Sequence, residues 1–255
     1  MFPKTSFWAT LCAALLFATA CLAQGTNLEV NRILREHRQA LGNPAQLQAV
    51  NSMRLSGVSE QDGQTFRFLL NQRDSGQIRY ELEADGRKVI QVFDGSNGWR
   101  WIEGEPEFGA TRLNAGQLRF FRIFQSFQPI LQDYLRYGFQ VEYLGEHTFA
   151  GEPSVGEHHL RLTSEEHGDV VDVWLSVRAM LETRRAYRPA ADATPLEFHF
   201  TDYRYVDGLL VPHRVSVQLE NEVIASTVID KAVTNVGLLS FYFTKPSSFR
   251  EVAPE

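Results

Sequence analysis

The amino-acid sequence predicts an α+β protein dominated by one large antiparallel β-sheet. Apolar and polar residues alternate in two consecutive segments, the first with Phe66, Phe68 and Leu70 and the second with Ile78, Tyr80 and Leu82. A period of two indicates strands with one apolar and one solvated face, which is typical of antiparallel sheets. Asp-Gly pairs at 62–63, 85–86 and 94–95 stand where hairpin turns need residues that tolerate positive φ. We therefore expect the six apolar residues to share one buried face, with Arg67, Arg79 and Glu81 on the wet face.

The first 23 residues have the pattern of a signal peptide. Lys4 supplies a short positive region, an apolar run follows over 7–18, and small residues precede Gln24. We expect cleavage after Ala23, so that residues 24–255 form the mature protein as a single domain. Residues 18–21 (Ala-Thr-Ala-Cys) also have the outline of a lipoprotein box, so lipid attachment at Cys21 is the alternative.

The composition of the mature chain excludes several classes of protein. Both cysteines, Cys12 and Cys21, lie in the leader, so a disulfide framework, a cysteine nucleophile and a thiolate metal site are all excluded. Export without disulfides fits a bacterial envelope. The formal charge of −6 becomes −7 when Lys4 is removed, and such an acidic body argues against nucleic acid as a partner.

A helix is predicted to open the mature chain, followed by a first group of strands. Thr26 or Asn27 can cap the helix, and residues 42–44 (Gly-Asn-Pro) are expected to end it. Its apolar stripe at helical spacing contains Val30, Ile33, Leu34, His37 and Leu41. Five strands are then expected over 51–60, 64–73, 77–84, 87–94 and 98–103.

The pattern changes to helical spacing between residues 115 and 137, a stretch named here the helical insert. Two short helices are predicted, at about 115–126 and 129–137, with Gln128-Pro129 between them. The insert is rich in aromatic residues, among them Phe120, Phe121, Phe124 and Phe127. Two interpretations remain open: an ordinary plug that fills the core against the sheet, or a mobile lid over a cavity.

Seven further strands are predicted after Gly138. They span about 139–147, 156–163, 169–176, 180–188, 195–205, 210–219 and 222–235. About twelve strands against three helices define the α+β class. Twisted sheets rarely stay open beyond about ten strands, so this sheet is expected to curl.

The sequence offers little sign of catalytic or metal chemistry. His158 and His159 are adjacent on a strand and must point to opposite faces, while His199 and His213 could pair across a hairpin near Asp202. No Gly-x-Ser-x-Gly elbow, phosphate-binding loop or dinucleotide fingerprint occurs. We therefore expect no metal, no cofactor and no catalytic residue, and a binding protein rather than an enzyme.

Several short motifs, in the predicted order of elements, resemble a known family. They are Asn-Gln-Arg at 71–73, Ile-Arg-Tyr at 78–80, Ile-Gln-Val-Phe-Asp-Gly at 90–95 with Trp99, and Thr-Asp-Tyr-Arg to Val-Pro at 201–212. With the leader, the first helix and the helical insert, they are similar to the LolA-like outer-membrane lipoprotein-sorting proteins. The resemblance spans nearly all of the mature chain.

This resemblance implies a strongly curved half-barrel of about 11–12 strands, whose concave apolar face holds lipid or lipoprotein acyl chains under a helical lid. The lipid-binding residues it implies are Phe66, Phe68, Leu70, Ile78, Tyr80, Leu82, Leu118, Phe121 and Phe124. It also implies that Arg73, just after the second strand, closes the lid through hydrogen bonds. In the sorting chaperone a proline follows that arginine, whereas Asp74 follows it here, so an arginine in a solvated turn is the competing account.

The leading functional hypothesis is therefore a periplasmic carrier of lipids or lipoprotein acyl chains that works by reversible opening of the helical insert, with envelope membrane proteins as candidate partners. The runner-up is a non-catalytic envelope protein with a filled core and a protein-binding or sensing surface. A third hypothesis is a hydrolase of lipid or glycan in which His199 acts as an acid or base. The volume and lining of the space between sheet and helices would separate the first two.

Overall fold

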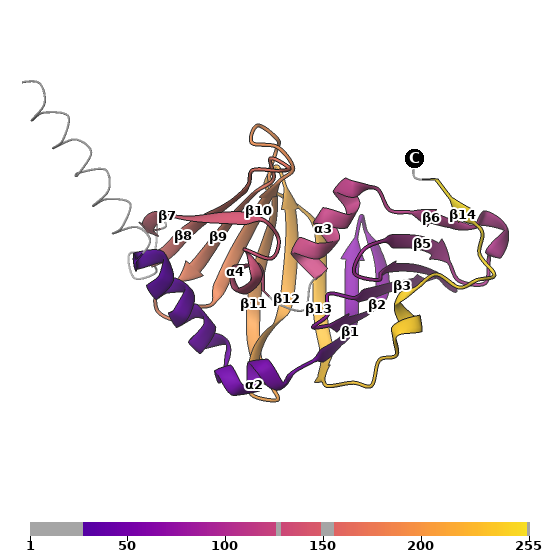
Figure 1. Ribbon diagram of the computed structural model, residues 1–255, viewed down its shortest axis with the longest axis horizontal. Coiled ribbons are helices and arrows are strands. Elements are labelled where there is room, and N and C mark those ends of the chain that lie inside the picture. Colours follow the sequence, from indigo (N-terminus) through magenta and orange to yellow (C-terminus); the bar gives the residue numbers. More distant parts are fainter. Residues whose placement is uncertain (1–27, 126–128, 149–155, 254–255) are drawn as a thin grey trace, which may run out of the picture.

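A computed structural model of the protein describes residues 28–125, 129–148 and 156–253. It confirms the α+β class and the large curved antiparallel sheet, which contains fourteen strands and does not close (Figure 1). The strand order is β14-β6-β5-β4-β3-β2-β1-β13-β12-β11-β10-β9-β8-β7. Pairing of β1 with β13 joins the two strand groups, so the chain forms one continuous sheet.

All twelve predicted strands are present. The first group is β1 (Ser52–Gln61), β2 (Gln64–Arg73), β3 (Ile78–Ala84), β4 (Arg87–Phe93) and β5 (Gly98–Ile102). The second is β7 (Phe139–Thr148), β8 (Gly156–Ser164), β9 (Val170–Ser176), β10 (Glu182–Arg188), β11 (Leu196–Val206), β12 (Leu209–Leu219) and β13 (Glu222–Thr234). Two short strands, β6 (Ala110–Arg112) and β14 (Glu251–Val252), were not predicted, so the expected count of 11–12 was too low.

The N-terminal helix covers residues 28–41, close to the prediction, but a second helix follows it. Helix α2 (Pro44–Ala49) begins where the sequence predicted only a helix end. Asn43 accepts a hydrogen bond from the Ala45 amide, and Pro44 occupies the first helical position. Asn-Pro is thus both a stop for the preceding helix and a start for the next, since proline fits the first turn of a helix.

The helical insert forms α3 (Ala115–Gln125) and α4 (Ile130–Asp133). A reciprocal capping box starts α3: the Gln117 amide donates to Asn114 Oδ1, and the Asn114 amide donates to Gln117 Oε1, both at 2.9 Å. Both helices lie over one face of the sheet, as does the N-terminal helix (Figure 1). We name this the concave face and the opposite one the outer face. No helix in the described ranges is long and apolar enough to span a membrane.

The predicted strand register is confirmed on the concave face. Phe68 pairs with Leu82 and Leu70 with Tyr80, and all four belong to one apolar cluster. The outer face is not fully wet as expected, because Glu81 is buried. The reason is a chain segment that the periodicity did not reveal.

Residues 236–253, named here the C-terminal segment, cover part of the outer face. The 3-10 helix η2 (Ser240–Phe243) lies against β3, where the Tyr242 hydroxyl donates to Glu81 (3.1 Å). Arg79 pairs with the same carboxylate (2.6 Å) and lies 4.3 Å from the centre of the Tyr242 ring. Phe249 packs against Trp101, and β14 then pairs with β6 in parallel. The segment therefore adds a small second apolar layer and a final strand.

A second polar cluster lies on the outer face at the other half of the sheet. Asp172 of β9 is 1% exposed and pairs with His159 (2.8 Å), Arg161 (2.8 Å) and Arg188. These hydrogen bonds hold the pKa of its carboxyl far below the usual value, against the opposing effect of burial. Next to it, the ring of Trp174 stacks on His159 at 4.4 Å. The cluster covers the outer face with long polar side chains instead of a helix.

Candidate functional site: an apolar cavity with a buried ion pair

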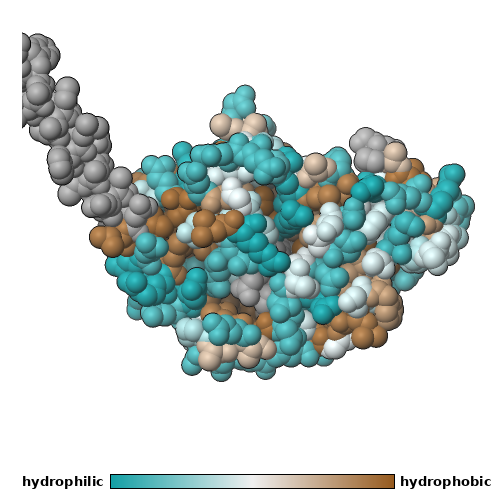
Figure 2. Space-filling view, in the orientation of Figure 1, coloured by the Kyte–Doolittle hydropathy of each residue, from teal (hydrophilic) through white to brown (hydrophobic). Residues whose placement is uncertain are grey.

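A cavity of about 530 Å³ separates the concave face from the helices. This volume lies within the range of small-molecule sites, roughly 300–1,000 Å³. Hydrophobic residues gather at a recess in the face seen in Figure 2. Aliphatic and aromatic side chains from both halves of the sheet line the space, together with Phe120 and Ile123 of α3.

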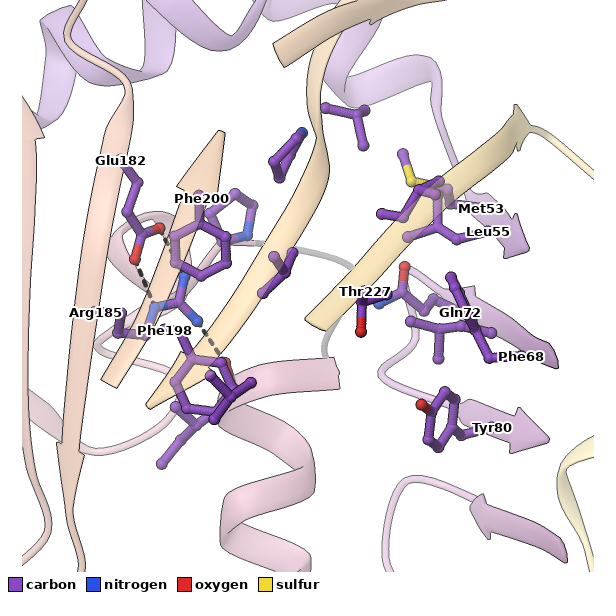
Figure 3. Close-up of a pocket in the computed structure, with 18 of the residues that line it drawn as sticks. Met53, Leu55, Phe68, Gln72, Tyr80, Glu182, Arg185, Phe198, Phe200 and Thr227 are labelled. Carbon is purple, nitrogen blue, oxygen red and sulfur yellow. Dashed lines mark hydrogen bonds and ion pairs between the residues drawn. The ribbon is translucent and has the colours of Figure 1, made fainter. Parts of the chain in front are cut away.

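The close-up view shows the two walls of this cavity (Figure 3). Glu182, Arg185, Phe198 and Phe200 lie on one side, and Met53, Leu55, Phe68, Gln72, Tyr80 and Thr227 lie on the other. The second wall is mainly apolar, while the first carries an ion pair. An occupant would therefore meet hydrocarbon on most sides and charge on one.

The ion pair reaches the cavity because strand β10 contains a bulge. Residues 182 and 185 are an odd number of positions apart, so in a regular strand their side chains would lie on opposite faces. The register shifts between Glu182 and Arg184, and this places Glu182 beside Leu175 and Arg185 beside Val173, both core residues of the concave face. The guanidinium of Arg185 then binds both oxygens of Glu182 at 2.7 Å.

The same arginine links the sheet to the helical insert. Its Nη1 donates to the carbonyl oxygen of Ile123 in the last turn of α3 (2.9 Å), where helical carbonyls lack intrahelical partners. Two more arginines hold α3: Arg119 pairs with the buried Asp169 (2.8 Å), and Arg122 lies 4.9 Å from the centre of the Phe93 ring. Three cationic contacts thus fix the helix that covers the cavity.

A buried histidine of the N-terminal helix lines the cavity as well. His37 is 1% exposed, and its Nδ1 lies 2.7 Å from the carbonyl oxygen of Met180. Burial lowers the pKa of this imidazole. Tyr203 lies in the same lining, where its hydroxyl donates to the backbone oxygen of Glu182 (2.7 Å) and burial raises its pKa. The polar side of the cavity is therefore built by residues from three separate elements.

The residues predicted to bind lipid fall into four groups. Phe68, Leu70, Tyr80 and Leu82 line the cavity. Ile78, Leu118 and Phe121 belong to the apolar cluster between α3 and the sheet, and Phe66 is half-buried outside the lining. The side chain of Phe124 and all of Phe127 lie outside the described residues, as do the leader and Cys21. Phe121 thus packs on the sheet directly, and α3 lines the cavity through Phe120 and Ile123 instead.

Arg73 lies at the end of β2, in the turn to β3. Its Nη1 donates to Gln77 Oε1 (2.9 Å) and to Ser240 Oγ of η2 (3.2 Å). The helical insert touches the same turn through another arginine, since Arg136 donates to the carbonyl oxygens of Asp74 (3.4 Å) and Ser75 (3.5 Å). The turn therefore contacts the insert, while Arg73 itself binds η2.

The histidine pair considered for catalysis or metal binding is not assembled. His199 stands opposite Ser216 in the strand register, and Nδ1 of His213 contacts the carbonyl oxygen of Val211 (2.9 Å). In the part of the chain that the structure describes, no three His, Cys, Asp or Glu side chains are placed to hold a metal ion.

Sequence reasoning missed the ion pair and the cavity role of His37. The bulge that brings Glu182 and Arg185 together leaves no mark in the alternation of β10. For His37 a signal was present, because a histidine stood within an otherwise apolar helical stripe.

The fold matches known structures, although the sequence is distant from them. No protein-family model matches the chain, and no curated protein matches its sequence. A LolA superfamily protein from Nitrosomonas europaea is similar with a TM-score of 0.60 and 12% identity, over 85% of this chain and 97% of that one. A DUF1329 family protein from Desulfovibrio piger is similar with a TM-score of 0.56 and 16% identity, over 87% and 99%.

A third similar structure is a putative outer membrane lipoprotein-sorting protein domain from Vibrio parahaemolyticus. Its TM-score is 0.56 at 11% identity, and the match covers 83% of this chain and 94% of that one. The chain therefore has a LolA-like fold, in agreement with the resemblance drawn from its motifs.

Proposed function

We propose that this protein is a periplasmic carrier that holds lipid or lipoprotein acyl chains in the cavity between its sheet and the helical insert. The cavity itself carries the proposal. A plug would fill this space, whereas about 530 Å³ lined mainly by hydrocarbon lies between the two layers. The LolA-like fold and the predicted signal peptide are consistent with such a role.

The energetics favour an acyl chain as occupant. Transfer of a methylene group from water to an apolar site contributes about 0.8 kcal/mol, so ten methylenes contribute on the order of 8 kcal/mol before ordering costs. Such binding needs shape and hydrocarbon rather than a set of polar groups. The lining of Phe68, Leu70 and Leu82 opposite Phe198 and Phe200 meets this need.

In this proposal α3 acts as a lid, and Arg185 holds it closed. The hydrogen bond from Arg185 to Ile123 joins the wall of the cavity to the end of the helix, and Glu182 fixes the guanidinium. Arg119 and Arg122 also hold α3, and none of the three contacts is part of a strand pair, so α3 can leave without disrupting one. The closing role implied for Arg73 remains a prediction.

A matched pair of substitutions on β13 tests the carrier function. Ala225 lines the cavity, and its neighbour Ser226 is exposed and lies on the opposite face of the strand. Ala225→Trp should fill the cavity and lower the amount of a fluorescent fatty acid that binds, while Ser226→Trp should leave binding unchanged. Native mass spectrometry of protein from an envelope fraction should show co-purified lipid on the parent and on Ser226→Trp, but not on Ala225→Trp.

Two results would contradict the carrier. The first is a parent protein that neither co-purifies with lipid nor binds the fatty acid, which favours the filled-core envelope protein. The second is unchanged binding of the fatty acid to Ala225→Trp, because the fatty acid would then bind elsewhere than in the cavity.

A further inference from the structure

One nitrogen of His37 stands out in the cavity wall. Nδ1 lies 2.7 Å from the carbonyl oxygen of Met180, while Nε2 is buried and has no hydrogen-bond partner among the described residues. Burying a polar atom without a partner is unfavourable, and folded proteins satisfy most such atoms. Nε2 lies at the end of the ring remote from the helix backbone, and the ring lines the cavity. The ring therefore offers an occupant one polar atom without a partner, which a small movement of the side chain must uncover before the occupant can reach it.

The hydrogen bond to Met180 defines what Nε2 can do. A carbonyl oxygen only accepts hydrogen bonds, so the proton of the neutral ring must reside on Nδ1. Burial lowers the pKa of the imidazole and keeps it neutral at physiological pH. Nε2 then carries a lone pair and acts only as an acceptor. Its partner must be a donor.

The neighbouring charges restrict that donor further. Glu182 and Arg185 already satisfy each other through two hydrogen bonds, and the pair is neutral as a unit. An anionic headgroup would approach the Glu182 carboxylate, and a cationic one would approach the Arg185 guanidinium, in both cases without a free counter-charge. A neutral hydroxyl group avoids repulsion from either charge and the burial of an uncompensated charge, and it supplies the donor for Nε2.

Building on the carrier function proposed above, we infer that the cavity selects a neutral amphiphile whose hydroxyl group donates to Nε2 of His37. The class comprises long-chain alcohols and hydroxyl-bearing neutral lipids. The apolar walls contact the hydrocarbon chain, and Nε2 of His37 accepts the hydrogen bond from the hydroxyl group. This specificity goes beyond the holding of any acyl chain.

A matched ligand pair tests the inference on the mature protein. The ligands are 1-dodecanol and dodecyl methyl ether, which share one oxygen and a twelve-carbon chain but differ in the donor. Isothermal titration calorimetry should give about three- to ten-fold tighter binding of the alcohol, the range expected for one net hydrogen bond.

Two variants separate the two ring nitrogens. His37→Asn keeps a donor near the position of Nδ1 for Met180 and removes Nε2, so both ligands should bind with equal affinity. His37→Gln places an amide oxygen near the position of Nε2 and should restore part of the preference for the alcohol. Circular dichroism should show the parent fold in both variants.

Three outcomes overturn the inference, in distinguishable ways. Equal affinity of the parent for both ligands refutes the role of Nε2 while leaving the carrier function intact. An equal fall of both affinities in His37→Asn assigns the ring a structural role only. Binding of neither ligand to the parent, in a preparation that also fails with the fatty acid, refutes the carrier function itself.

Discussion

The ion pair in the cavity wall makes a quantitative prediction about stability. Both side chains, of Glu182 and Arg185, are 8% exposed, so each charge depends on the other for compensation. Removal of one partner from a buried pair typically costs about 3–5 kcal/mol, because the remaining charge is left buried and alone. Glu182→Leu and Arg185→Met should each lower the free energy of unfolding by this amount.

The double variant should be more stable than either single one. With both charges gone, two apolar side chains occupy an apolar wall, and replacements of this kind are often neutral or stabilising. The losses that remain include the hydrogen bond from Arg185 to Ile123, about 1 kcal/mol, and the contact of Arg185 with the Phe200 ring. The coupling free energy between the two substitutions should therefore amount to several kcal/mol.

Urea unfolding, followed by tryptophan fluorescence and circular dichroism, measures these free energies. The matched control is Arg112 with Glu251, an exposed pair at 3.5 Å whose side chains are 50% and 43% accessible. Its coupling should stay below about 1 kcal/mol. Additive effects of Glu182→Leu and Arg185→Met would refute the reasoning, since they would mean that water screens the pair and that the wall is not dry.

Three further predictions concern other parts of the molecule. Asp172→Asn should be less stable than the parent at pH 7, and the difference in free energy of unfolding should narrow as the pH falls below about 4. The pKa of Asp172 is lower in the folded protein than in the unfolded chain, so the stabilisation is complete above the unfolded pKa and is lost as the pH falls toward the folded one. Urea unfolding at pH 7 and pH 3 checks this, and parallel pH profiles of the two proteins would contradict it. Gly98→Ala should lower the melting temperature, because a Cβ there would lie 2.6 Å from Leu118 Cδ2 and push α3 away from the sheet; an unchanged melting temperature would show that α3 is not packed so closely. If Arg73 closes the lid, Arg73→Ala should release a bound fatty acid faster than the parent does in stopped-flow fluorescence. An unchanged release rate would contradict the closing role of Arg73.

The strands were predictable because each depends on a pattern of neighbouring residues in the sequence. Alternation of apolar and polar residues and Asp-Gly turns identified every long strand, and the same parity predicted that Phe68 and Leu82 lie on one face of the sheet. Helix α2 was missed because Asn43-Pro44 suits a helix end and a helix start equally. The C-terminal segment was missed because isolated aromatic residues such as Phe243 and Phe249 anchor it without any period.

The polar part of the site could not be predicted from local patterns. A bulge in β10 reverses the parity between Glu182 and Arg185, and bulges depend on pairing with the neighbouring strand. Arg73 was predicted to close the lid because it stands after the second strand, where the LolA-like family has an arginine. The arginine that touches α3, Arg185, lies about a hundred residues later in the sequence, and only the tertiary structure brings it there.

The pairing of β14 with β6 has a consequence for how copies of this protein behave in solution. Within the described residues the sheet ends at β14 on one side and at β7 on the other. A bare strand edge is a template on which another chain can add. Strand β7 carries a bulge between Tyr143 and Gly145 together with Glu142 and Glu146, features that discourage such addition.

At the opposite side, β14 occupies the place on β6 where a foreign strand would bind. Loss of the C-terminal segment would uncover β6 and with it the apolar surface around Trp101. A molecule clipped in this way exposes the edge of β6, to which a strand of another copy can add. We therefore expect the short strand β14 to limit self-assembly through this edge of the sheet.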